Sequence, residues 1–314
     1  IAYMALHNDH PEYFWLSRAC MLSSYDGKTY AAFASGSQVD YNFSKAQAAS
    51  MQYELLEMVG QAFADCLKAG MSEYERQLAL HDWLIKRCEY SYAAANNPDV
   101  NPSAYESYGA LVQGSAVCEG YSRAYQLLCY YAGINCTLAT GEDLASGGPH
   151  MWNLVWVEDE PYFSDLTWDD GPLPGYDFFN QTTQQMNKTH RLEPNLNTLT
   201  TAQLEEMSTI GFNFNLPVCT ATQNNYFVKN GLLANDLAEF SSIFPTKAVQ
   251  IANAGKRQIQ FWCTWRTFGD ADDIQQLISP LMGQINGQIT SSYNQIRSYQ
   301  IVYIPGSSFF TILW

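Results

Sequence analysis

Cys118 is the residue of this sequence that is best placed for chemistry. It lies in GSAVCEGYSRAYQLL, residues 114–128, where a turn of small residues meets a run that predicts a helix. A thiolate attacks carbonyl carbons far better than a thiol does, and a helix N-terminus with a nearby imidazole favours the thiolate. The backbone N–H of Cys118 would point outward as half of an oxyanion hole, and Gly120 would leave space beside the sulfur. A packing role in the core is the alternative for a lone cysteine.

The sequence also supplies a base and a group to orient it. His150 follows the flexible stretch GEDLASGGP and directly precedes a predicted strand, so a sheet would hold it while leaving it open to a cleft. Asp165 lies on the next predicted strand, and hairpin pairing of the two strands would bring its carboxylate near the imidazole. Cysteine, histidine and aspartate together are the nucleophile, base and orienting group of acyl transfer.

Three motifs around these residues resemble the transglutaminase-like superfamily. They are Cys118-Glu119-Gly120-Tyr121 at a helix start, His150-Met151-Trp152-Asn153 at the opening of a strand, and Asp165-Leu166-Thr167-Trp168-Asp169 on the next strand. The resemblance covers about residues 75–190. It implies a papain-like core with Cys118 as nucleophile, His150 as base and Asp165 as the orienting residue.

The resemblance leaves the reaction open. The superfamily includes protein cross-linkers, cysteine peptidases, peptide N-glycanases and inactive members, and the active ones share a thioester step. We expect a thiol enzyme acting on a peptide or protein amide, by peptidase-like hydrolysis in preference to acyl transfer to an amine. A glycanase is disfavoured because the paired zinc cysteines that precede the core in those proteins do not occur here. A catalytically inactive cell-surface binding scaffold is the alternative from another functional class.

Three further residues are candidates for positioning substrate or the oxyanion. Gln113 lies five positions before Cys118, and in papain-like enzymes an upstream glutamine donates to the oxyanion; a solvent-facing turn residue is the alternative. Trp152 is expected to cover His150 and exclude water, or to pack in the core. Tyr108, like Tyr105, precedes the nucleophile segment, and its hydroxyl is a candidate contact of the thiol or the oxyanion. Structural roles are expected for the remaining candidates, His81, His190, Asp169 and Asp170.

The elements that would position these residues are helices packed on an antiparallel sheet, which is an α+β fold. A helical repeat of apolar residues runs from Ser44 to Gly70. Ser72 and Glu75 form a capping box that begins a second helix. Further predicted elements are a helix over 119–131, strands over 135–140, 151–157 and 161–168, and a long loop over 90–107.

The same patterns predict three regions. They are an N-terminal helical region over residues 1–70, a transglutaminase-like catalytic core over 71–195, and a C-terminal accessory α+β domain over 196–314. In the last region, residues 200–245 are mixed and loop-rich, a strand is expected from Ile259 to Trp265, and 270–282 begin with acidic residues, as helices prefer. Pro305-Gly306 between two apolar runs predicts a hairpin.

Composition limits the partners. The 314 residues carry a net charge of −15, and 47% of them are hydrophobic. So acidic a chain disfavours nucleic acid and anionic membrane surfaces, and no apolar run reaches the roughly 18 residues of a membrane span. The expected partner is a protein or peptide substrate, associated with a cell surface or cell wall. The resemblance to bacterial proteins that are often exported implies a secreted or cell-surface location, although a signal peptide is not present in this sequence.

The eight cysteines contain no C-x-x-C pair, so a zinc ribbon and a thioredoxin-type motif are disfavoured. Most are expected to be buried free thiols. The sequence also contains no His-Glu-x-x-His motif, no twelve-residue calcium loop and no glycine-rich phosphate loop. We therefore expect neither a metal nor a cofactor.

Overall fold

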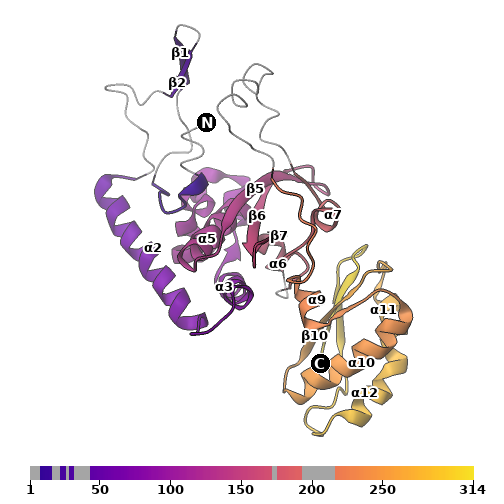
Figure 1. Cartoon of the computed structure of the whole chain (residues 1–314). Helices are drawn as coiled ribbons and strands as arrows, with labels where there is room; N and C mark the ends of the chain where they lie inside the picture. The colour runs from indigo at the N-terminus through magenta and orange to yellow at the C-terminus, as the bar shows by residue number, and fades with distance from the viewer. Residues whose placement is uncertain (1–7, 16–21, 26–27, 32–42, 172–174, 193–215) are drawn as a thin grey trace. The chain divides into compact units, whose positions relative to one another are not determined.

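The structure is a computed structural model that describes residues 8–15, 22–25, 28–31, 43–171, 175–192 and 216–314. The chain divides into two compact units, residues 1–174 with 178–221 and residues 175–177 with 222–314. Figure 1 shows the first in indigo to magenta and the second mainly in orange to yellow. The three-region division stays a prediction. Cys20 and the first seven residues lie outside the described residues.

A four-stranded antiparallel sheet forms the centre of the first unit. In the order β7-β6-β5-β8 it contains β7 (Glu160–Ser164), β6 (Pro149–Val157), β5 (Cys136–Asp143) and β8 (His190–Leu192). The two residues between β6 and β7, Glu158 and Asp159, have φ of 54° and 66°, as a tight hairpin turn requires. Asn153 pairs with Ser164, so the chain leaves β7 beside the middle of β6, three residues from His150.

Helix α5 (Cys118–Tyr131) packs against this sheet and against α3 (Glu73–Arg87). Its residues Glu119–Cys129 are all buried, so protein surrounds the helix that begins at the candidate nucleophile. The predicted capping box of α3 is confirmed, because Ser72 and Glu75 bond each other's backbone N–H. Helix α2 (Lys45–Cys66) begins at Ser44 as predicted but ends before Gly70, and it packs against α3 (Figure 1).

The segment before the nucleophile is more ordered than the predicted long loop. It contains β3 (Glu89–Tyr90), α4 (Tyr92–Asn96), η1 (Pro98–Val100), η2 (Pro102–Tyr105), η3 (Gly109–Gln113) and β4 (Ser115–Ala116). β3 and β4 pair in parallel, and Ser91, Asn97 and the prolines begin the short helices. The loop prediction was wrong because Asn, Ser and Pro cap and start short helices as well as filling loops.

Gly120 lies where two segments approach each other closely. A Cβ at this position would lie 2.3 Å from the Ala104 carbonyl oxygen, a distance at which real Cβ atoms do not occur. The Ala104 carbonyl also accepts the N–H of Val117 at 2.9 Å. Glycine at 120 therefore lets η2 approach the first turn of α5.

The predicted strand over 161–168 is wrong beyond Ser164. There β7 ends, and residues Leu166–Asp169 form the short helix α6. Asp165 caps this helix, because its Oδ1 accepts the N–H groups of Thr167 and Trp168. The remaining short elements of the first unit are β1 (Leu22–Tyr25), β2 (Lys28–Ala31) and α7 (Thr183–Met186).

The second unit is built on a four-stranded mixed sheet in the order β11-β12-β10-β9. Its elements are α9 (Tyr226–Asn230), β9 (Leu233–Ala234), α10 (Leu237–Asn253), β10 (Gln258–Cys263), α11 (Ala271–Ile278), η4 (Ser279–Leu281), α12 (Met282–Gln288), β11 (Gln300–Tyr303) and β12 (Phe309–Leu313). The predicted strand, acidic helix start and terminal hairpin are confirmed. Helix α10 was missed within the loop-rich stretch, although Phe240, Phe244, Ala248 and Ala252 repeat at helical spacing.

Candidate active site

Cys118 is the first residue of α5 and is partly buried. Val117, the residue before it, is extended and places no side chain on the helix amides. The N–H groups of a first helical turn have no acceptor within the helix, so the sulfur and its own amide share an open helix end. Ser122, one turn on, donates its hydroxyl to the carbonyls of Cys118 and Met151, at 2.8 and 3.1 Å. That contact joins the nucleophile turn to β6.

The side chain of Asn153 makes a second contact between α5 and β6. Its Nδ2 donates to the Ser122 carbonyl at 2.9 Å and to the Cys136 sulfur at 3.4 Å. Because Asn153 is three residues after His150 on β6, these bonds help to fix the strand that carries the imidazole against the helix that carries the thiol.

His150 lies between Asp165 and Cys118. Its Nε2 is 2.6 Å from Asp165 Oδ2, and the Cys118 side chain lies close enough to the ring to interact with it. Since Asp165 occupies Nε2, the thiol interaction falls to Nδ1. Burial lowers the pKa of His150, but the Asp165 carboxylate and the Cys118 side chain outweigh it and raise the pKa to about 10. At neutral pH the imidazole therefore carries the proton, which is the state that a thiolate partner needs.

Asp165 is fully buried, and all its acceptor sites face donors. Oδ1 accepts two backbone N–H groups of α6, and Oδ2 faces the Nε2 atoms of His150 and His190 at 2.6 and 3.0 Å. Burial raises the pKa of Asp165, but the two imidazoles outweigh it and hold the pKa well below its usual range. The carboxylate is therefore ionised and fixed in orientation.

His190 also belongs to this network, although the sequence predicted only a structural role for it. It opens β8, which pairs with β5 in the same sheet, and its ring is buried. Its Nδ1 lies 2.8 Å from the Thr189 hydroxyl and its Nε2 faces Asp165. The available signal was a histidine that follows a short polar helix and begins a strand. That signal does not show which carboxylate the ring will contact, because the contact depends on the pairing of β8 with the edge of the sheet.

Two tryptophan rings lie against the imidazoles. Trp152 is stacked on His150 with 5.9 Å between ring centroids, and Trp168 is 5.5 Å from His150 and 4.4 Å from His190. Trp152 is buried and also belongs to a core cluster with Ala139, Leu154 and Phe163. It thus has both of the expected features, a place beside His150 and a place in the core.

The structure brings together Cys118, His150, Asp165 and Trp152, but it places Gln113 and Tyr108 on other partners. Gln113 is exposed, and its Oε1 accepts from the Asn101 side chain at 3.1 Å. Tyr108 donates its hydroxyl to Glu54 on α2 at 2.6 Å. Their positioning roles stay predictions that these contacts do not support.

A second buried histidine–aspartate pair braces the same region. His81 of α3 faces Asp169 and Asp82, each at 3.1 Å, and Asp169 also accepts the N–H of Phe178. Burial lowers the pKa of His81, but the two carboxylates outweigh it and raise the pKa to about 9. Asp170 accepts the hydroxyl of Tyr121. These contacts give His81, Asp169 and Asp170 the structural roles expected of them.

His150, Asp165 and His190 are also the described residues whose ligand atoms come closest to a metal-binding arrangement, within 4.8 Å of one another. The same two Nε2 atoms and Oδ2 already lie at hydrogen-bond distances of 2.6 and 3.0 Å. A metal there would displace the protons that the two Nε2 atoms share with the Asp165 carboxylate. We therefore assign the arrangement to proton-mediated contacts.

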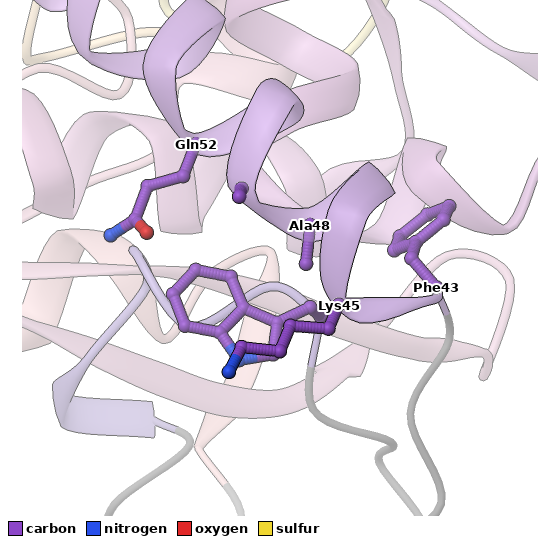
Figure 2. A pocket seen from close by; sticks show the side chains of 6 residues that line it. Phe43, Lys45, Ala48 and Gln52 are labelled. Carbon is purple, nitrogen blue, oxygen red and sulfur yellow. The ribbon is translucent and has the colours of Figure 1, made fainter.

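A cavity at the start of α2 is separate from these residues. It has a volume of about 480 Å³ and is lined by Trp15, Phe43, Lys45, Ala48, Ala49 and Gln52. Figure 2 shows Lys45 and Gln52 as polar side chains on its wall. Its lining includes none of Cys118, His150 and Asp165.

Residues 61–168 match the model of the transglutaminase-like superfamily. The chain carries a transglutaminase-like domain. The family expected from the three motifs and the α+β fold are both confirmed. The kyphoscoliosis peptidases of Mus musculus and Homo sapiens are 26% and 27% identical over 139 and 118 residues, which are 41% and 34% of this chain. A solved crystal structure of a TGase is 18% identical with a TM-score of 0.33, and the match covers 40% of this chain and 34% of that one.

The transglutaminase-like domain contains Cys118, His150 and Asp165, whereas His190 follows it in sequence. The matched parts span 21% and 18% of the mouse and human relatives. No helix among the described ranges has the length and apolar character needed to cross a bilayer.

The raised pKa of His150 predicts that stability falls at alkaline pH. Because its folded pKa of about 10 lies above the ordinary 6.5, protonated His150 stabilises the fold fully below pH 6.5, and this contribution is lost as the pH rises through 10. Asp165, with a lowered pKa, contributes above its ordinary 3.8 and loses that contribution as the pH falls. We expect urea unfolding to show that the free energy of unfolding falls by about 4 kcal/mol between about pH 7 and about pH 10.5.

The matched control for this pH dependence is His150→Asn, whose amide does not titrate. Its stability should change less between neutral and alkaline pH than that of the unmodified chain. Equal slopes for the two proteins would show that the His150 proton contributes nothing to folding.

Proposed function

We propose that the transglutaminase-like domain is a cysteine hydrolase that cleaves a peptide or protein amide through an acyl-enzyme on Cys118. The observation that carries the proposal is the position of His150, which is hydrogen-bonded to Asp165 at 2.6 Å and has the Cys118 side chain close enough to raise its pKa. A core packing role for Cys118 would not require a partly buried thiol beside a protonated imidazole.

In the first step, the Cys118 thiolate forms a bond to the carbonyl carbon, and the carbonyl electron pair moves to oxygen. As this intermediate collapses, the C–N bond breaks and His150 gives its proton to the leaving amine. Asp165 stabilises the imidazolium and holds the ring, as its two hydrogen-bonded oxygens allow. In the second step, neutral His150 takes a proton from water, which attacks the thioester and releases the acid.

Water is proposed as the acceptor in preference to an amine. The two curated relatives with matching sequence are both named peptidases. Transfer to an amine is the competing outcome of the same acyl-enzyme. A secreted or cell-surface location, with a protein substrate there, is part of the proposal.

The test compares the two acceptors directly. The full chain is incubated with denatured casein in ¹⁸O-water, with and without a fluorescent primary amine, and the products are analysed by mass spectrometry. Hydrolysis predicts one ¹⁸O atom in new carboxylates, and prior iodoacetamide treatment should prevent this by alkylating Cys118 before the other described thiols. The buried Cys88 and Cys263, whose pKa values burial raises to about 12, should react last.

If the products contain the fluorescent amine in place of ¹⁸O, the reaction is acyl transfer to an amine and not hydrolysis. If neither product forms, and if iodoacetamide alkylates the thiols slowly and without selectivity, the enzyme proposal is overturned and the binding scaffold remains.

A further inference from the structure

Tyr90 is held beside the nucleophile by the short strand pair that precedes α5. It ends β3, and its register partner in β4 is Ala116, two residues before Cys118. The next residue, Ser91, donates its N–H to the Ala116 carbonyl at 2.8 Å. The Tyr90 ring is half-buried and packs on a small cluster of Ala94, Ala104 and Val117. Both backbone and ring are therefore fixed against the residue that directly precedes the nucleophile.

The hydroxyl of Tyr90 is uncommitted, unlike those of Tyr105, Tyr108 and Tyr121. Tyr105, which packs on the same cluster, donates to the Ala94 carbonyl at 3.0 Å. Tyr108 donates to Glu54, and Tyr121 donates to Asp170. Within the described part of the chain, no hydrogen bond of the Tyr90 hydroxyl occurs, and the ring's neighbour Tyr92 meets it edge-on with 5.0 Å between centroids. A phenol that is positioned but unpaired is ready to bond a group that arrives with the substrate.

The electrostatics of Tyr90 place it in the field of the candidate site. Burial and the Cys118 side chain raise the pKa of Tyr90 to about 12, with Tyr105, Tyr92 and Asp165 adding to the effect. Charge interactions of this kind fall off with distance, so they agree with the placement given by the strand pair. They also keep the phenol neutral and able to donate a hydrogen bond over the working pH range.

We propose that the Tyr90 hydroxyl, together with the backbone N–H of Cys118, donates a hydrogen bond to the oxyanion that forms when the Cys118 thiolate adds to a substrate carbonyl. This inference rests on the proposed function and adds a catalytic residue to it. Tyr90 keeps its proton throughout. The bond to the oxyanion strengthens as the carbonyl electron pair moves to oxygen and weakens again when the C=O bond re-forms, so it stabilises the transition state more than the substrate.

The experiment separates acylation from alkylation of the same sulfur in Tyr90→Phe. p-Nitrophenyl acetate acylates a thiolate through a tetrahedral oxyanion and reports the step by release of p-nitrophenolate, without requiring the natural substrate. Iodoacetamide alkylates the thiolate by direct displacement and forms no oxyanion. The matched control is Tyr105→Phe, which removes a hydroxyl from the same cluster that is bonded to Ala94 instead. Cys118→Ala supplies the background rate.

We expect Tyr90→Phe to slow Cys118-dependent acylation about a hundredfold, in line with the loss of one oxyanion donor, and to change the alkylation rate less than threefold. Tyr105→Phe should change neither rate by more than threefold. Equal acylation by Tyr90→Phe and the unmodified chain would overturn the assignment. So would equal slowing of acylation and alkylation, because the hydroxyl would then act on the thiolate. Acylation that is the same in Cys118→Ala as in the unmodified chain would instead overturn the proposed function itself.

Discussion

Replacing Cys118 by alanine is expected to abolish peptide hydrolysis, with a fall in kcat/KM of about 10⁵-fold or more. No other group in the arrangement is able to form the acyl-enzyme. His150 faces the sulfur and Asp165, so His150 and Asp165 are placed to hold or transfer protons. The fold should survive, because Cys118 is only partly buried at the first position of α5, where alanine is well tolerated. We expect the free energy of unfolding to change by less than about 1 kcal/mol.

Cys66→Ala is the matched control for this substitution. Cys66 is also a partly buried free thiol at a helix end, the last residue of α2, and burial raises its pKa to about 11. Its loss should leave kcat/KM within about twofold. Hydrolysis by Cys118→Ala within tenfold of the unmodified chain, measured by the ¹⁸O assay, would show that the reaction uses another nucleophile.

The three motif residues were predictable because each occupies a position defined by local structure. Cys118 begins a helix, and His150 lies at the start of a strand whose hairpin partner leads to Asp165. A two-residue turn between strands leaves little freedom in register, so the separation of His150 and Asp165 in space follows almost directly from their separation in sequence.

The parts that were missed depend on contacts between distant segments. His190 reaches Asp165 only because β8 adds to the edge of the sheet next to β5, which no local pattern specifies. Tyr90 reaches the nucleophile through a strand pair of two residues inside a segment whose composition predicts a loop. For Gln113 the distance from Cys118 in sequence left an oxyanion donor and a solvent-facing turn residue both open. The residue ends a π-helical turn before Gly114, which has φ of 68°, and its exposed side chain accepts from Asn101.

The replacement Asp165→Asn is expected to lower kcat by about 10⁴-fold, as inversion of an imidazole tautomer does in a comparable triad. Asp165 accepts from four donors: two backbone N–H groups at Oδ1 and two imidazoles at Oδ2. Asparagine has only one acceptor oxygen. If the NH₂ group of asparagine faces α6, it opposes the two backbone N–H donors and the helix cap is lost. If the NH₂ group faces His150, Nε2 must lose its proton to accept the bond, and the thiol loses the imidazole tautomer that it needs. Either orientation should also cost about 2–4 kcal/mol in the free energy of unfolding.

Stability loss alone must be separated from the catalytic effect, and Asp169→Asn provides the comparison. Asp169 is equally buried, lies in the same turn of α6, and pairs with His81 as Asp165 pairs with His150. It should lose a similar free energy of unfolding, because one buried imidazole and the Phe178 N–H lose their charged partner. Its kcat at a temperature well below unfolding should fall less than tenfold, since the two ring nitrogens of His81 face Asp82 and Asp169. Equal kcat losses in the two variants, measured by hydrolysis of one peptide at matched folded fractions, would show that Asp165 acts on the fold alone and not on the protonation of His150.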